Sequence, residues 1–182
     1  MHSANGRISV VYNGEIYNFQ ELKEELKDYP FRSTCDTEVI IAAYMKWGID
    51  CISRLNGMFA ICIFDREDDT VYLVRDRIGK KPLYYELSDG NLIFGSELKP
   101  LMAREGFQKR IRKDVLSRYL FQQYINAPDS IFEQVYKLEP GGILQFHYGE
   151  VKTWKYWDIK NVYHEMRKNP VTDYEQAKSE LK

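Results

Sequence analysis

An unbroken apolar run, GMFAICIFD at residues 57–65, places the strongest constraint on how this chain folds. A strand with one face in water alternates apolar and polar residues, whereas this run does not alternate. We therefore expect a strand that is buried on both faces. Helical apolar spacing at residues 18–27 and 36–47 predicts two helices that can cover such a sheet. The pattern predicts a layered α and β domain with sheet packed on sheet.

Shorter segments fill in the rest of this layered domain. Asn18 followed by Glu21 has the spacing of a capping box at a helix start. Ser88-Asp89-Gly90 is a hairpin turn signal between two strand-like segments. Thr172 is expected to open a last helix after a polar linker. We expect further strands at 8–12, 71–74, 82–87, 91–94, around 135, and at 142–148 and 151–157, with a helix at 113–124.

Composition excludes several classes of function. The 182 residues carry a net charge of −1 and a pI of about 6.3, so no general field attracts nucleic acid or an anionic membrane. No apolar stretch has the length of a membrane span, and no signal-peptide core begins the sequence. Cys35, Cys51 and Cys62 have neither metal-ligand nor disulfide-framework spacing. We expect one cytoplasmic domain with no metal site and no nucleic-acid or membrane partner.

Six motifs in order resemble the glutaminase domain of glutamine-dependent asparagine synthetases. They are YNGEIYNFQEL from residue 12, STCDTEVI from 33, LNGMFAICIFD from 55, VRDRIGKKPLYY from 74, GSELKPL from 95 and KLEPGG from 137. Those domains are class II amidotransferases with an N-terminal-nucleophile hydrolase fold. The resemblance covers residues 6–158 and implies an α/β (α+β) fold: a four-layer αββα sandwich of antiparallel sheets.

The resemblance also implies where glutamine binds. It maps the oxyanion hole onto the side-chain amide of Asn13 and the backbone N–H of Gly14, and one such donor is typically worth ~2.7–4 kcal/mol. It makes Asn13, Glu15 and Asp36 the glutamine-binding residues, with the two carboxylates holding the α-amino group. On this interpretation Asn-Gly-Glu ends a strand and faces a ligand. Each residue alone has a plainer explanation: a turn at Asn13-Gly14, a surface charge at Glu15, and a helix N-cap at Asp36.

The nucleophile of that family is a cysteine at the mature N-terminus, whose α-amine acts as base. Position 2 is His2, and an internal cysteine has no α-amine of its own. We therefore expect a glutaminase domain cut at both ends and lacking its first strand or strands. Such a chain should bind glutamine weakly if at all and should not hydrolyse it. No catalytic role is assigned to the Arg75-Asp76-Arg77 motif, for which a structural ion-pair network is as good an explanation.

The expected organisation is a glutaminase domain at 1–158, followed at 159–182 by a linker and the start of a synthetase domain. The parent enzyme would make asparagine from aspartate, glutamine and ATP. ATP and magnesium would bind in the synthetase domain, and this chain would hold no cofactor. The expected partners are L-glutamine and that synthetase domain, with a homodimer left open. The alternatives are an amidotransferase acting on another carboxylate, and a non-catalytic module for amino-acid binding or assembly.

Overall fold

Two antiparallel sheets form the centre of this computed structural model, which describes residues 1–168 and 170–180. The larger sheet has five strands in the order β1-β2-β3-β7-β8. Adjacent strands of this sheet are antiparallel; for example, Asn13 pairs with Ala60 and Ile61 pairs with Val74. The strands are β1 (Ile8–Ile16), β2 (Gly57–Asp65), β3 (Thr70–Arg75), β7 (Gly142–His147) and β8 (Glu150–Lys155).

The smaller sheet has three strands in the order β5-β4-β6. Its strands are β4 (Tyr84–Ser88), β5 (Asn91–Gly95) and β6 (Val135–Lys137). The predicted hairpin between β4 and β5 is confirmed, and Asp89 and Gly90 both have positive φ at its turn, 52° and 74°. Two adjacent residues with positive φ match the twist of the flanking strands.

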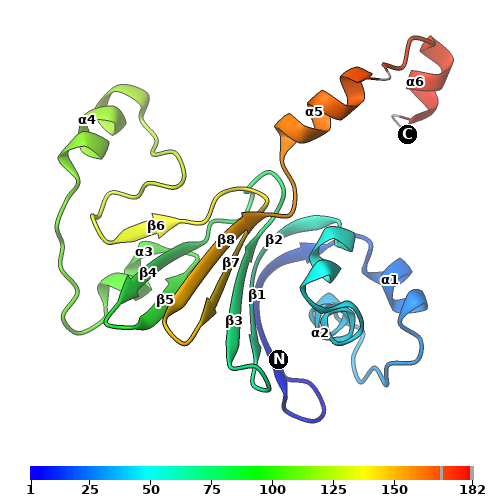
Figure 1. Cartoon of the computed structure of the whole chain (residues 1–182), viewed down its shortest axis with the longest axis horizontal. Coiled ribbons are helices and arrows are strands. Elements are labelled where there is room, and N and C mark those ends of the chain that lie inside the picture. Colours follow the sequence, from blue (N-terminus) through cyan, green and yellow to red (C-terminus); the bar gives the residue numbers. More distant parts are fainter. Residues whose placement is uncertain (169, 181–182) are drawn as a thin grey trace.

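Helices close the outer faces of both sheets, as Figure 1 shows. On the five-stranded sheet lie α1 (Phe19–Glu25), α2 (Asp36–Trp47) and the 3₁₀ helix η1 (Gly48–Arg54). On the three-stranded sheet lies the short helix α3 (Leu98–Met102). Three separate apolar cores join the layers: helix to large sheet, sheet to sheet, and small sheet to α3. The predicted αββα layering with antiparallel sheets is confirmed.

Strand β2 explains why the layers are needed. Phe59 and Ile61 point to the helix-side core, whereas Ala60 and Cys62 point to the core between the sheets. All four side chains are buried. The prediction of a strand buried on both faces is therefore confirmed, with the predicted bounds.

Strand β1 runs further than the sequence indicated. It was expected to end at Tyr12, but its pairing with β2 continues to Ile16 opposite Gly57. The two backbones pack so closely that a Cβ on Gly14 would lie 2.1 Å from the Met58 carbonyl oxygen, and one on Gly57 equally close to that of Glu15. Only glycine fits at such positions. The Asn-Gly-Glu motif therefore lies within a strand and does not end one.

The predicted capping box at Asn18 is wrong. The Asn18 side chain makes no cap hydrogen bond to α1. Its amide instead donates to the Arg54 carbonyl, and its Oδ1 accepts from the Asn56 N–H, at 3.0 and 2.9 Å. Asn18 ties the start of α1 to the loop before β2, so a long-range contact replaces the local one.

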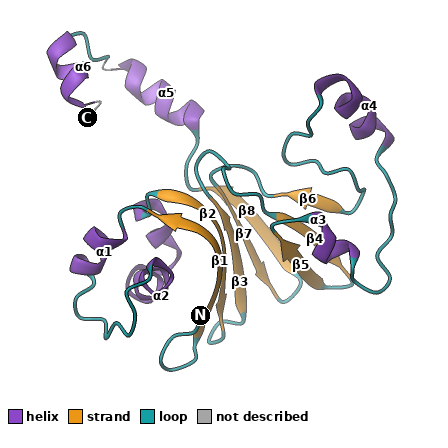
Figure 2. Cartoon of the chain, turned by 180° about the vertical axis from the view of Figure 1, so that it is seen from behind, coloured by secondary structure: helices purple, strands orange, loops and turns teal. Residues whose placement is uncertain are grey.

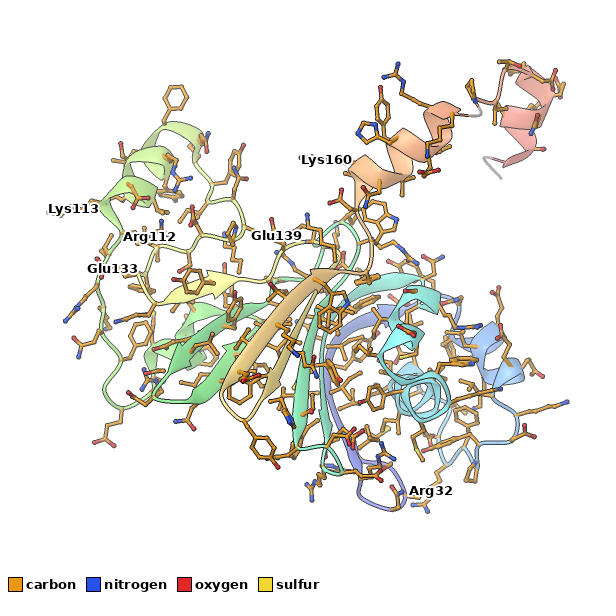
Figure 3. All side chains as sticks on the ribbon, viewed as in Figure 1. Arg32, Arg112, Lys113, Glu133, Glu139 and Lys160 are labelled. Carbon is orange, nitrogen blue, oxygen red and sulfur yellow. The ribbon has the colours of Figure 1, made fainter. Side chains whose placement is uncertain are left out.

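Helix α4 (Lys113–Gln122) stands away from the sheets (Figures 1 and 2). Val115 is its one buried residue, whereas Leu120 and Phe121 are 73% and 89% exposed. Asp129, in the loop after α4, forms ion pairs with Arg112, just before the helix, and with Arg118 in it. Figure 3 shows Arg112 and Glu133 at this side of the molecule and Arg32 at the opposite one.

The C-terminal part forms two helices that extend from the sandwich (Figure 1). The segment expected to be a linker contains α5 (Ile159–Lys168), a helix that the sequence did not predict and none of whose described residues is buried. Helix α6 (Tyr174–Glu180) begins slightly later than predicted, with the Asp173 carboxylate accepting from the Gln176 N–H at 2.8 Å. The domain boundary at residue 158 stays a prediction. Within the described residues, no helix is long and apolar enough to cross a membrane.

Candidate active site

A cavity of about 200 Å³ lies where the middle of β1 and β2 faces the end of β5. Asn13 and Cys62 line it from the large sheet, and Phe94 and Ser96 line it from the small sheet. The cavity is therefore made by the packing of the two sheets, which brings together segments more than eighty residues apart.

Asn13 crosses this cavity to the other sheet. Its Nδ2 donates a hydrogen bond of 3.0 Å to Ser96 Oγ, just beyond the end of β5. The rest of the Asn13 side chain is exposed. The amide that the sequence singled out is thus held at the mouth of a cavity and retains a second N–H.

The backbone N–H of Gly14 points out of the open edge of β1. Val10 exchanges both of its backbone hydrogen bonds with Met1 on that edge, and the Ile16 N–H on the same edge donates to Asp36. Groups on alternate residues of a strand point to the same side, so the N–H of Gly14 does too. No hydrogen bond within the described residues uses it. The unpaired N–H of Gly14 is therefore one residue along β1 from the Asn13 side-chain amide.

Asp36 begins α2 and reaches the opposite face of β1. Its Oδ2 accepts from the Tyr12 hydroxyl at 2.7 Å and from the Ile16 N–H at 3.1 Å. Burial raises the pKa of Tyr12, and the bond to Asp36 raises it further, with Glu15 adding to the effect. Both carboxylates therefore favour the neutral form of the Tyr12 phenol.

Side chains alternate between the two faces of a strand, so Glu15 lies on the same face of β1 as Asn13 and on the opposite face from Tyr12. It is exposed, and in the part of the chain that is described its carboxylate has no hydrogen bond or ion pair. The structure thus joins Asn13 to Ser96, while Asp36 lies with Tyr12, which packs on the helix-side core. A single pocket shared by Asn13, Glu15 and Asp36 stays a prediction.

The three thiols differ in environment. Cys62 lines the cavity, but burial raises its pKa to about 12, and burial does the same at Cys51. Both thiols therefore remain protonated near neutral pH, and a protonated thiol is a poor nucleophile. At Cys35 burial opposes ionisation, but hydrogen bonds from Ser33 and from the start of α2 lower the thiol pKa overall. Cys35 does not line the cavity that holds Asn13.

Among the described residues, the Arg75-Asp76-Arg77 motif makes hydrogen bonds to the backbone and no ion pairs. The fully buried carboxylate of Asp76 accepts from four backbone N–H groups, of Phe59, Ile78, Lys80 and Lys81. Arg75 donates to three backbone carbonyls and Arg77 to two. The motif fixes the loop after β3, which lies beside the β1–β2 pair.

Sequence reasoning missed Ser96. The residue stands inside one of the six motifs, GSELKPL, yet it was given no role. A serine directly after a strand is ordinarily the start of a turn or helix. Its contact with Asn13, 83 residues away, is visible only in three dimensions. No group of three metal-ligating side chains lies together within the described residues.

Comparison with known proteins shows which family this chain belongs to. The profile of the glutamine amidotransferase domain matches residues 1–157. Asparagine synthetase (glutamine-hydrolyzing) 3 of Bacillus subtilis is 32% identical over 159 residues, which is 86% of this chain and 26% of that protein. Asparagine synthetase (glutamine-hydrolyzing) 1 of the same species is 40% identical over 134 residues, 72% of this chain and 21% of that protein. The chain thus spans less than a third of the length of these relatives.

Solved structures show the same architecture. Glutamine phosphoribosylpyrophosphate amidotransferase from B. subtilis superposes with a TM-score of 0.59 and 20% identity, over 86% of this chain and 31% of that one. At this identity the likeness shows the fold alone, and it confirms the predicted N-terminal-nucleophile hydrolase type. Because the family profile covers nearly the whole sandwich and includes the Asn13-Gly14 segment, this chain belongs to the glutamine amidotransferase domain family.

Proposed function

We propose that this chain is the glutamine-binding part of a glutaminase domain in an asparagine-synthetase-type amidotransferase. The observation that carries the proposal is the pair of donors on β1: the Asn13 amide at a cavity mouth and the free Gly14 N–H on the strand edge. The second N–H of Asn13 Nδ2 and the Gly14 N–H are neutral donors, which suit a carbonyl oxygen that becomes negative during reaction.

In this proposal the substrate side-chain amide places its oxygen between the Asn13 Nδ2–H and the Gly14 N–H. When a nucleophile attacks the amide carbon, the π electron pair of the C=O bond moves onto that oxygen. Because the donors belong to a paired strand, they need little rearrangement as the charge develops. The absent Cβ of Gly14 lets β1 pack closely against β2, which fixes the strand that carries both donors.

The α-amino group of glutamine is assigned to Glu15 and Asp36. The Glu15 carboxylate has no partner among the residues that the structure describes, and Asp36 has a second oxygen, Oδ1, beside the one that Tyr12 and Ile16 use. An ammonium group between two carboxylates makes charge-assisted hydrogen bonds. Asp36 already reaches the open edge of β1, because its Oδ2 accepts from the Ile16 N–H there.

The activity of the whole protein is part of the same proposal. The relatives named as glutamine-hydrolyzing asparagine synthetases are three to five times longer than the matched segment. We assign to such a longer protein the amidation of aspartate, with ATP and magnesium bound in its synthetase domain. Another carboxylate acceptor remains the alternative, because acceptor choice depends on that domain. The three unpaired cysteines suit a cytoplasmic location.

A second candidate is a non-catalytic amino-acid-binding module. The observation that favours it is the state of the thiols: the one in the cavity, Cys62, is kept protonated by burial. A module of this kind would bind the amino acid through the same donors without cleaving it. Ammonia release by the full-length protein separates the two candidates, since only the glutaminase releases it.

Ligand-observed NMR tests glutamine binding directly, because it detects weak complexes. The chain should bind L-glutamine in preference to D-glutamine and L-glutamate. Asn13→Ala should weaken binding at least threefold, whereas Asn91→Ala, at an exposed asparagine in the β4–β5 hairpin, should leave it unchanged. Equal binding of L-glutamine by wild type and Asn13→Ala would contradict the assignment of Asn13.

A further inference from the structure

We propose that Ser96 is a positioning residue that holds the Asn13 carboxamide in the orientation needed to receive a carbonyl oxygen. The inference rests on the proposed function and adds a residue from the second sheet to it. Its basis is the 3.0 Å hydrogen bond from Asn13 Nδ2 to Ser96 Oγ across the cavity.

Asn13 needs such a partner because its side chain has little else to hold it. The torsion that turns an asparagine amide is broad and has nearly equivalent positions with nitrogen and oxygen exchanged. Within the described residues the bond to Ser96 is the only one that Asn13's side chain makes. Turned over, the amide would present its oxygen to the ligand and repel a carbonyl. In the orientation that the structure shows, the Ser96 hydroxyl accepts from Nδ2, and this bond holds the second N–H of the Asn13 amide in place.

Ser96 is itself held by packed structure. It follows Gly95, the last residue of β5, which pairs with Tyr84 of β4. Beyond it begins α3, whose Leu101 is fully buried and lies 3.3 Å from the Cβ position of Gly95. A strand end and a packed helix thus place the hydroxyl on a rigid base, which precise positioning requires.

The hydroxyl also has a proton to give. A serine that accepts one hydrogen bond can still donate one, and no acceptor for Ser96 Oγ–H is found within the described residues. It therefore adds a second donor at the cavity beside Asn13 Nδ2–H, while the Gly14 N–H lies on the adjacent strand edge. All three favour a ligand whose oxygen accepts, such as the side-chain amide of glutamine.

Three variants test this inference. Ser96→Ala removes the hydroxyl, Ser96→Thr keeps it, and Ser88→Ala removes the hydroxyl of a half-buried serine in the β4–β5 hairpin as a control. In the ligand-free protein, Ser96→Ala should shift the two Asn13 side-chain N–H resonances and speed their exchange with water, whereas Thr should restore both. Affinity for L-glutamine should fall about threefold to tenfold in Ser96→Ala, the effect of one hydrogen bond, and stay near wild type in the other two.

The outcomes separate Ser96 from the proposed function. If wild type binds L-glutamine and Ser96→Ala binds it equally well, the positioning role is overturned while the proposed function stands. Unchanged Asn13 resonances in Ser96→Ala overturn the role without reference to any ligand. If wild type does not bind L-glutamine while the Asn13 resonances respond to Ser96→Ala, the hydrogen bond exists but the proposed function fails, and the inference fails with it.

Discussion

Helices α2 and α4 have similar apolar spacing in the sequence, but α2 is largely buried in the structure and α4 is largely exposed. Seven residues of α2 are buried against the five-stranded sheet, whereas α4 buries only Val115 and leaves Leu120 and Phe121 in solvent. A helical apolar stripe shows that a face can be covered, but not what covers it. Helix α2 packs against β1, the strand that carries the site, so the site rests on the largest of the three apolar cores.

The largest expected effect tests this difference in packing. Ile40→Ala on α2 removes a fully buried side chain from the helix-side core and should lower the free energy of unfolding by about 2–5 kcal/mol. Leu120→Ala on α4 should change it by less than about 0.5 kcal/mol, because that side chain is mostly exposed. Urea denaturation of both variants measures the contrast, and a loss above 2 kcal/mol for Leu120→Ala would show that α4 is packed against something.

Two aspartates sharpen the same comparison. Asp76→Ala would leave four backbone N–H groups beside the site without an acceptor and should cost about 1–3 kcal/mol for the buried donors. Asp129→Ala at the foot of α4 removes ion pairs to partly exposed arginines, worth about 0–1 kcal/mol. Thermal unfolding of the two variants should rank Asp76→Ala as the less stable. The reverse order would mean that α4 and its loop matter more to folding than the loop after β3.

Glycines on either side of the cavity should also differ. Gly14→Ala puts a Cβ 2.1 Å from a backbone oxygen and should cost about 1–3 kcal/mol through forced strand separation. At Gly95 the nearest atom is the end of the Leu101 side chain, at 3.3 Å, which can move aside. Gly95→Ala should therefore be the milder change in a denaturation curve. Equal stability of Gly14→Ala and wild type would refute the close β1–β2 packing.

The smallest effect concerns pH. The Arg7 guanidinium lowers the pKa of the buried Asp65 carboxyl below its ordinary 3.8, so the fold favours the ionised form. This stabilisation is present above pH 3.8 and is lost as pH falls through the lower folded-state pKa. Asp65→Asn should flatten the acid side of the stability–pH curve, whereas Asp114→Asn at exposed α4 should change it less. An acid limb that keeps its full slope in Asp65→Asn would count against the Arg7 contact.

The apolar pattern of the sequence predicted the elements whose bounds depend only on neighbouring residues. The bounds of β2 and α2 follow from an unbroken apolar run and from a helical stripe, and both matched the structure. The end of β1 was missed because Asn13-Gly14 resembles a turn, while its pairing depends on Gly57, more than forty residues away. Helix α5 was missed because its polar residues resemble a linker and it buries no apolar face.

The candidate site divides in the same way. The order of motifs along the chain predicts Asn13 and Gly14 as site residues, and the structure gives the amide a cavity and the N–H an open strand edge. Ser96 was missed because its role depends on how one sheet packs on the other. The position of Asp36 at the start of α2 was predicted, but its bond to Tyr12 was not, since the residue pattern carries no sign of which face of β1 it meets.

Backbone amide shifts on addition of L-glutamine test the central claim most directly, namely that the meeting point of β1 and β5 is the glutamine site. We predict that the perturbed amides cluster at Asn13, Gly14 and Ser96, while those of Leu120 and Phe121 on α4 remain unchanged. Shifts concentrated on α4, or an undisturbed β1 under saturating L-glutamine, would contradict it.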